Sequence, residues 1–187
     1  MVTGGPHPNV ESSRRGEFAA GRACARAALA SLGAEPIGIP MQADRSPAWP
    51  RGFVGAISHS SGYCVAAVGS SSRFLGIGID AEAIGAVERD VWDVVFVPRE
   101  IRLLETLPLE RQRLAATIVF SAKESFYKCR STTQHLDFTD VEIVVCESRF
   151  SVRASGTNPA RSRSSLLASG TFAIEDNRVL TGIAISR

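Results

Sequence analysis

Two long helix-forming stretches, each followed by short strand-forming segments, limit what this chain can fold into. The first helix is expected from about Arg14 to Leu32, an alanine-rich stretch that stops at Gly33. The second is expected over 109–129, where apolar residues recur at helical spacing. Strands are expected in the apolar segments Phe53–Ser58, Tyr63–Val68, Phe74–Ile79, Val141–Cys146, Phe150–Arg153, Thr171–Ile174 and Val179–Ile185. Helix and then strands, twice over, predicts an α+β fold with two similar α+β halves in one chain.

Length and composition fit a folded globular protein. The chain has 187 residues, of which 44% are hydrophobic and 21% charged, and this excludes a disordered chain. We expect a flexible N-terminus over residues 1–13, an N-terminal half over 14–82 and a C-terminal half over 83–187. No apolar run approaches the length of a membrane span, and the N-terminus lacks the apolar core of a signal peptide. These features predict a cytoplasmic protein.

Charge and metal-ligand spacing narrow the function classes further. The net charge of +2 is too balanced for a general nucleic-acid or membrane binder. The four cysteines and three histidines are not spaced as zinc ligands, and we expect reduced thiols. Among the 21 basic residues, Lys123 and Lys128 are the lysines, and both fall within one short segment. A lysine amid arginines suggests a need for a compact, point-like charge.

A pair of carboxylates ends one of the expected strands. In GIGIDAE, Asp80 and Glu82 stand at i and i+2 and therefore project from the same face. Two like charges on one face repel unless a cation lies between them, and a hard divalent cation with oxygen ligands fits. The alternative is that the strand ends in a solvent-exposed acidic turn and that the two carboxylates bind no metal.

Two other segments carry candidate functional groups. In FSAKESFYK, Glu124 and Lys128 are at i, i+4 on one helix face, which suits either a site or a plain surface ion pair. In ISHSSG, a strand delivers Ser58 and His59 to a turn, where the histidine suits an anion ligand. A serine hydrolase is disfavoured because the sequence has no G-x-S-x-G elbow there.

Taken together, S-H, G-I-D-x-E and K-E-S-x-x-K, in this order, resemble the 4′-phosphopantetheinyl transferase superfamily. The likeness is greatest to the branch of the enterobactin-synthetase transferase and the actinobacterial transferases. It extends to EFAAGRACARAAL, SPAWPRGFVGAISH, LDF and VLTGIAI, and so covers most of the chain. The resemblance implies a monomer of two similar α+β halves with the active site between them. It also implies transfer of the phosphopantetheine arm of coenzyme A to a carrier-protein serine, with release of 3′,5′-ADP.

The resemblance further implies roles for individual residues. Asp80, Glu82 and Glu124 correspond to the acidic ligands of Mg²⁺, or of Mn²⁺ in its place. Glu124 and Lys128 correspond to the catalytic pair, with Lys128 on the phosphates. The implied coenzyme A-binding residues are Arg14, Arg22, Arg45, Ser58, His59, Lys123 and Lys128. His59, with Ser58 beside it, corresponds to the contact with the 3′-phosphate.

The implied partners are acyl- or peptidyl-carrier domains of siderophore, nonribosomal peptide or polyketide biosynthesis, with neither nucleic acid nor membrane involved. No motif of the family is missing, so we expect a complete enzyme. One alternative is a coenzyme A-binding acyltransferase or hydrolase with His59 as general base. Another is a non-catalytic interaction module that uses the apolar segment Val91–Pro98 as its partner surface.

Overall fold

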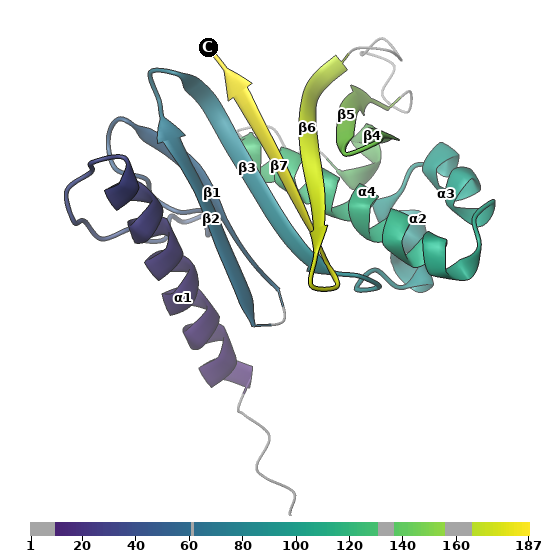
Figure 1. Ribbon diagram of the computed structural model, residues 1–187, viewed down its shortest axis with the longest axis horizontal. Helices are drawn as coiled ribbons and strands as arrows, with labels where there is room; N and C mark the ends of the chain where they lie inside the picture. Colours follow the sequence, from purple (N-terminus) through teal and green to yellow (C-terminus); the bar gives the residue numbers. More distant parts are fainter. Residues whose placement is uncertain (1–9, 61, 131–136, 156–165) are drawn as a thin grey trace, which may run out of the picture.

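Figure 1 shows the computed structural model, which describes residues 10–60, 62–130, 137–155 and 166–187, with side chains described from residue 15 onward. The elements are α1 (Val10–Ser31), β1 (Phe53–Ser60), β2 (Tyr63–Ser70), β3 (Phe74–Ala83), η1 (Arg89–Val91), α2 (Trp92–Val95), α3 (Pro98–Glu105), α4 (Leu109–Cys129), η2 (Phe138–Asp140), β4 (Val141–Cys146), β5 (Arg149–Ala154), β6 (Leu166–Glu175) and β7 (Arg178–Ser186). Both helices and strands are present in quantity, as the α+β expectation requires.

The first helix packs on a small antiparallel sheet of β1 and β2 (Figure 1). Its buried face contributes Ala25 and Leu29 to a small core that continues with Ile39 of the following segment. Gly21 is required where α1 crosses β1, since a Cβ atom there would lie 2.8 Å from Ile57 Cγ2. The helix ends at a left-handed glycine, Gly33, with φ +76°.

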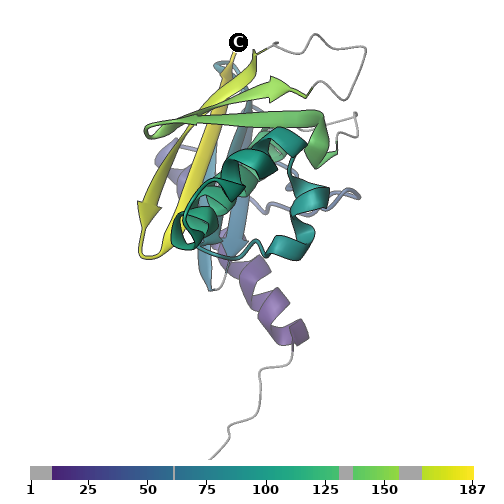
Figure 2. The same ribbon diagram turned by 90° about the vertical axis from the view of Figure 1, so that its right-hand side faces the viewer.

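The larger sheet is antiparallel, with strand order β3-β7-β6-β5-β4. Helix α4 packs across it, and α2 and α3 lie beside α4 at the right of Figure 1; Figure 2 shows the same layers from that side. The main core lies between α4 and this sheet, and includes Phe126, Val141 and Val152, each nearly or fully buried.

Several expected elements are confirmed. Two of them have the expected bounds, whereas the ends of others differ from the prediction. The helix over 109–129 and the strand over 141–146 have the expected bounds. The first helix begins at Val10, so residues 10–13, expected to be loose, are helical, and residues 1–9 lie outside the described residues. Strand β3, assigned to the N-terminal half, pairs with β7 and so belongs to the larger sheet. The division at residue 82 stays a prediction.

The apolar segment Val91–Pro98 is mainly core, so the expectation of a partner surface there is wrong. Trp92, Phe96 and Val97 are all nearly buried, whereas Val94 is exposed. The segment forms a short helix and the turn into α3, and its large side chains pack under α4. Among the described residues, no helix combines the length and apolarity needed to cross a membrane.

Candidate active site

The candidate site forms where β3 and α4 come into close contact. Gly76, Gly78 and Asp80 alternate along one face of β3, and this face lies against α4. A Cβ atom on Gly78 would lie 1.7 Å from the Ser125 carbonyl oxygen, so the helix can approach this closely only where β3 has glycine. The glycines of GIGID therefore bring the C-terminal part of α4, with Glu124 and Lys128, beside the acidic end of β3.

Asp80 is the most buried carboxylate of the site, with 1% of the residue exposed. Its Oδ1 accepts hydrogen bonds from Ser58 Oγ at 2.8 Å and from Lys128 Nζ at 2.6 Å. Lys128 Nζ also donates to Ser58 Oγ at 3.1 Å. The other carboxylate oxygen, Oδ2, is buried without a hydrogen-bond partner among the described residues. A buried, unpartnered carboxylate oxygen costs free energy unless a ligand completes its coordination.

Glu82 and Glu124 flank Asp80 and are half-buried. Glu82 Oε2 accepts a hydrogen bond from Ser60 Oγ at 3.0 Å, and Glu124 Oε2 lies 3.7 Å from Lys128 Nζ. Burial raises the pKa of the Glu82 carboxyl, and the charge of Asp80 raises it further. Burial also raises the pKa of Glu124, against the opposing effect of Lys128. The shared strand face expected for Asp80 and Glu82 is thus occupied by an acidic cluster with Lys128 at its centre.

The donor set fits a hard divalent cation, although it is not arranged to hold one as it stands. In the described part of the chain, no group of three or more His, Cys, Asp or Glu side chains forms a ready metal site. The three carboxylates nevertheless supply oxygen ligands, one of which, Asp80 Oδ2, is buried and unpartnered. Lys128 supplies the positive charge that the cluster needs in the absence of a metal.

Lys123 is not in the site, and its expected contact with coenzyme A does not hold in this structure. Its side chain is 0% exposed. Nζ donates to Glu100 Oε2 at 2.7 Å, to the Val95 carbonyl oxygen at 2.9 Å and to the Phe138 carbonyl oxygen at 2.8 Å. All three donor positions of the ammonium are thereby used inside the protein.

Two of the N-terminal candidates, Arg22 and His59, have partners other than the carboxylates. Arg22 is nearly buried, donates from Nε to the Ile39 carbonyl oxygen at 2.7 Å and stacks its guanidinium over Phe18. It therefore holds the segment after α1, which is a structural role that sequence reasoning did not foresee. His59 is exposed on β1, with Nδ1 3.6 Å from Glu17 Oε2 of α1. The side chain of Arg14 lies outside the described residues.

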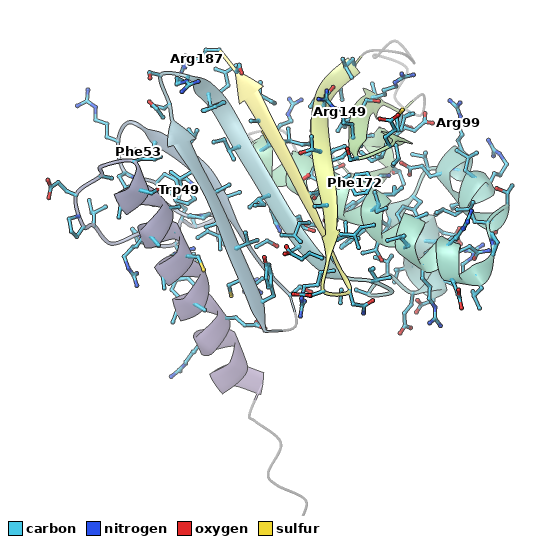
Figure 3. The ribbon with its side chains drawn as sticks, in the orientation of Figure 1. Trp49, Phe53, Arg99, Arg149, Phe172 and Arg187 are labelled. Atoms are coloured by element: carbon cyan, nitrogen blue, oxygen red, sulfur yellow. The ribbon has the colours of Figure 1, made fainter. Side chains whose placement is uncertain are left out.

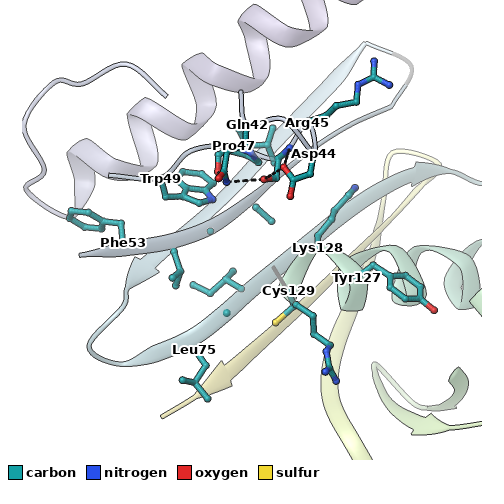
Figure 4. Close-up of a pocket in the computed structure, with 18 residues that line it drawn as sticks. Gln42, Asp44, Arg45, Pro47, Trp49, Phe53, Leu75, Tyr127, Lys128 and Cys129 are labelled. Atoms are coloured by element: carbon teal, nitrogen blue, oxygen red, sulfur yellow. Dashed lines mark hydrogen bonds between the residues drawn. The ribbon is translucent and has the colours of Figure 1, made fainter. Parts of the chain in front are cut away.

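A cavity of about 550 Å³ lies at the C-terminal end of α4, where Lys128 is one of its lining residues (Figure 4). It is lined by the segment between Gln42 and Trp49, by β1, by the start of β3 and by the end of α4. Lys128 both lines this cavity and contacts Asp80, so it links the cavity to the carboxylate cluster, although Asp80, Glu82 and Glu124 are not among the lining residues. Arg45 lies at its rim, with φ 69°. This volume is within the range of small-molecule sites.

Sequence reasoning assigned no role to Trp49, Tyr127 or Ser60. Trp49 and Tyr127 line the cavity, and Trp49 belongs to the SPAWPRG segment that carried part of the resemblance. Ser60 follows Ser58 at i+2 on β1, just as Glu82 follows Asp80 on β3, and the two strands match serine to carboxylate. That parallel spacing was the signal that could have identified Ser60.

Comparison with known proteins identifies the family. The family model "4′-phosphopantetheinyl transferase N-terminal domain" matches residues 8–69, and "4′-phosphopantetheinyl transferase superfamily" matches residues 76–180. Because the second match covers more than half of the chain, this protein belongs to the 4′-phosphopantetheinyl transferase superfamily.

Comparison with individual relatives supports the same family assignment. The 4′-phosphopantetheinyl transferase Npt of Nocardia iowensis is 40% identical over 141 residues, covering 72% of this chain and 60% of the relative. The 4′-phosphopantetheinyl transferase PptT of Mycobacterium tuberculosis is 37% identical over 137 residues, covering 71% of this chain and 59% of the relative. Enterobactin synthase component D of Escherichia coli is 34% identical over 134 residues, covering 70% and 62%. The chain thus spans about 60% of the length of the curated relatives it matches.

Likeness to solved structures is weaker. Holo-[acyl-carrier-protein] synthase of Thermotoga maritima aligns with a TM-score of 0.48 and 20% identity, over 61% of this chain and 65% of that chain. A likeness at this level carries no weight for function. The α+β assignment rests on the helices and sheets described above.

Proposed function

We propose that this protein transfers the 4′-phosphopantetheine arm of coenzyme A to a serine of an acyl- or peptidyl-carrier domain, releasing 3′,5′-ADP. The observation that carries the proposal is that Lys128, which lines the cavity, forms ion pairs with Asp80 and Glu124 of the carboxylate cluster. Lys128 joins the two in a member of the 4′-phosphopantetheinyl transferase superfamily. A pyrophosphate bound in the cavity would reach Lys128, whose Nζ is already paired with two of the proposed metal-binding carboxylates.

Mg²⁺ is the metal that this proposal assigns to Asp80, Glu82 and Glu124, with Mn²⁺ as a substitute. When bound there, it would supply positive charge against the pyrophosphate of coenzyme A. Lys128, released from Asp80, would then turn toward the phosphate oxygens of coenzyme A in the cavity. Its 29% exposed side chain leaves room for such a movement.

Glu124 is the proposed acceptor of the proton from the carrier serine. The serine oxygen forms a bond to the β-phosphorus of coenzyme A. The bond from that phosphorus to the bridging oxygen breaks, and its electron pair leaves with 3′,5′-ADP.

Coenzyme A is proposed to lie in the cavity, with Ser58 and His59 on β1 and Arg45 at the rim as its polar contacts. Ser58 directly follows Ile57, which lines the cavity, and it bonds both Asp80 and Lys128. We further propose that the protein acts as a cytoplasmic monomer on carrier domains of siderophore, nonribosomal peptide or polyketide biosynthesis.

A mass-shift assay tests the function. The full chain, coenzyme A, Mg²⁺ and an apo carrier domain should yield a carrier that gains the phosphopantetheine mass, together with 3′,5′-ADP. Excess EDTA should stop the transfer, and added Mg²⁺ should restore it. Release of free coenzyme A from an acyl-coenzyme A, without a carrier mass shift, would support the alternative acyltransferase or hydrolase instead.

The catalytic assignment needs a matched pair of variants on α4. Glu124→Gln should lower the rate of transfer at least about 100-fold, which corresponds to about 2.7 kcal/mol. Glu110→Gln, at an exposed position in the first turn of the same helix, should leave the rate unchanged. Equal rates for both variants would contradict the role of Glu124.

A further inference from the structure

A contact between two hairpins lies next to the carboxylate cluster. The turn of β6 and β7 and the end of β1 meet at the lower end of the sheets in Figure 1. Arg178, the first residue of β7, donates from Nη1 to the Ser60 carbonyl oxygen at 2.9 Å. Its guanidinium also lies over the Tyr63 ring, 5.3 Å from the ring centre. Because Ser60 and Tyr63 are paired residues of the β1–β2 hairpin, Arg178 holds that hairpin from both strands.

The residue held by Arg178 is the one that orients Glu82. The Ser60 backbone carbonyl accepts from Arg178, while the Ser60 hydroxyl donates to Glu82 Oε2 at 3.0 Å. Arg178 is also the strand partner of Ala83, the residue directly after Glu82. The Arg178 side chain thus contacts β1 at Ser60, while its backbone pairs with β3 next to Glu82.

Glu82 depends on this support more than the other two carboxylates do. Lys128 forms an ion pair with Asp80 and with Glu124, but within the described ranges no ion pair to Glu82 is formed. The Ser60 hydroxyl is the hydrogen bond that fixes the Glu82 carboxylate in the described structure. Displacement of Ser60 would thus leave Glu82 free to turn away from the cluster.

We propose that Arg178 is a positioning residue for the metal site: it fixes Ser60 against Glu82 and so sets the geometry of that carboxylate toward the divalent cation. This role rests on the proposed function, since the cation is part of it. Groups that orient metal ligands from outside commonly change metal affinity about 10-fold or more when they are removed.

The experiment uses Arg178→Met, which keeps an apolar side chain over Tyr63 and removes the hydrogen-bond donor. Its matched control is Arg187→Met. Arg187 follows β7 at the opposite end (Figure 3) and donates from Nε to the Ser71 carbonyl oxygen, far from the carboxylates. Mg²⁺ affinity is measured by calorimetry with saturating coenzyme A and no carrier, so that no turnover occurs. Coenzyme A affinity is measured separately in EDTA.

We expect Arg178→Met to weaken Mg²⁺ binding about 10-fold, with coenzyme A binding in EDTA and the Arg187→Met protein both unchanged. Ser60→Ala provides a second variant, since it keeps the Arg178 contact to the backbone and removes the Glu82 hydrogen bond. Ser60→Ala should also weaken Mg²⁺ binding. If Arg178→Met fails to fold, this variant tests whether the Ser60–Glu82 contact sets the metal affinity.

Each other outcome is decisive. Mg²⁺ affinity unchanged in Arg178→Met or in Ser60→Ala, while wild type binds the metal, would overturn the positioning role and leave the proposed function standing. Wild-type protein that binds no Mg²⁺ would overturn the metal site and the positioning role together. Wild-type protein that binds Mg²⁺ but transfers nothing to a carrier would overturn the proposed function alone.

Discussion

Lys123 and Glu124 are adjacent in the sequence, yet they belong to two opposite kinds of charged cluster. Lys123 is sealed in the core with Glu100, whose carboxylate also accepts from the backbone N–H groups of Val97 and Ile143. Glu124 belongs to the half-open group of Asp80, Glu82 and Lys128, which retains a buried carboxylate oxygen without a partner.

The difference shows how a structural charge pair can be told from a site. Around Lys123 and Glu100, every ammonium donor and both carboxylate oxygens have partners, so nothing is left over to bind a ligand. Around Asp80, three carboxylates gather near one lysine, which pairs with Asp80 and Glu124 but not with Glu82, and the excess negative charge is left for a cation from outside. The residues of the site are thus distinguished by charges and hydrogen-bonding atoms that lack partners within the described part of the protein, and not by burial itself.

The largest effect should come from breaking the sealed pair. Lys123→Met would leave the Glu100 carboxylate buried without its counter-charge, and removal of one partner of a buried pair costs about 3–5 kcal/mol. The loss of unfolding free energy is measured by urea unfolding. Arg99→Met is the matched control, since it removes an ion pair between α3 and β4 whose arginine is 66% exposed, and it should cost less than about 1 kcal/mol. Equal losses of unfolding free energy in the two variants would contradict the larger contribution expected from the buried Lys123–Glu100 pair.

A smaller effect with an unusual sign should come from the lysine of the open cluster. Lys128→Met removes the internal cation that neutralises Asp80, so Mg²⁺ should bind the coenzyme A-free protein about 10-fold more tightly. Calorimetry without coenzyme A measures this. Arg130→Met, at the end of the same helix, should leave the Mg²⁺ affinity unchanged. If Lys128 served the phosphates alone, its loss would not alter metal affinity under these conditions.

The smallest effect concerns stability and pH. Because burial raises the pKa of Glu82, the folded protein binds that proton more tightly than the unfolded chain does. Glu82 therefore adds stability at acidic pH, and this contribution is lost as pH rises through the folded-state pKa. Glu82→Gln should raise the Tm of the metal-free protein by about 2 °C at pH 8, corresponding to less than about 1 kcal/mol.

Two controls sharpen this last comparison. At pH 4 the gain from Glu82→Gln should vanish, since the glutamate is then protonated as well. Glu110→Gln, on the exposed surface, should change the Tm at neither pH. A destabilised Glu82→Gln protein at pH 8 would contradict the view that the cluster carries excess negative charge.

Local periodicity in the sequence was enough to determine the helix over 109–129, the strand over 141–146 and the spacing of the site. Asp80 and Glu82 share a strand face because of the period of two, and Glu124 and Lys128 share a helix face because of the i, i+4 repeat. The three motifs S-H, G-I-D-x-E and K-E-S-x-x-K lie in β1, β3 and α4. They could therefore be identified without a structure.

Only the tertiary structure decided which charged residues face inward. Lys123 and Lys128 are five residues apart, about 140° around the helix at 3.6 residues per turn, so they could not both face the site. Which of them turned into the core depended on Glu100, which is 23 residues away, and on where α3 packs. The contact of Arg178 with Ser60 spans 118 residues. Contacts of this kind depend on how elements that are distant in the sequence pack together. The short-range repeats that determine a helix or a strand do not specify them.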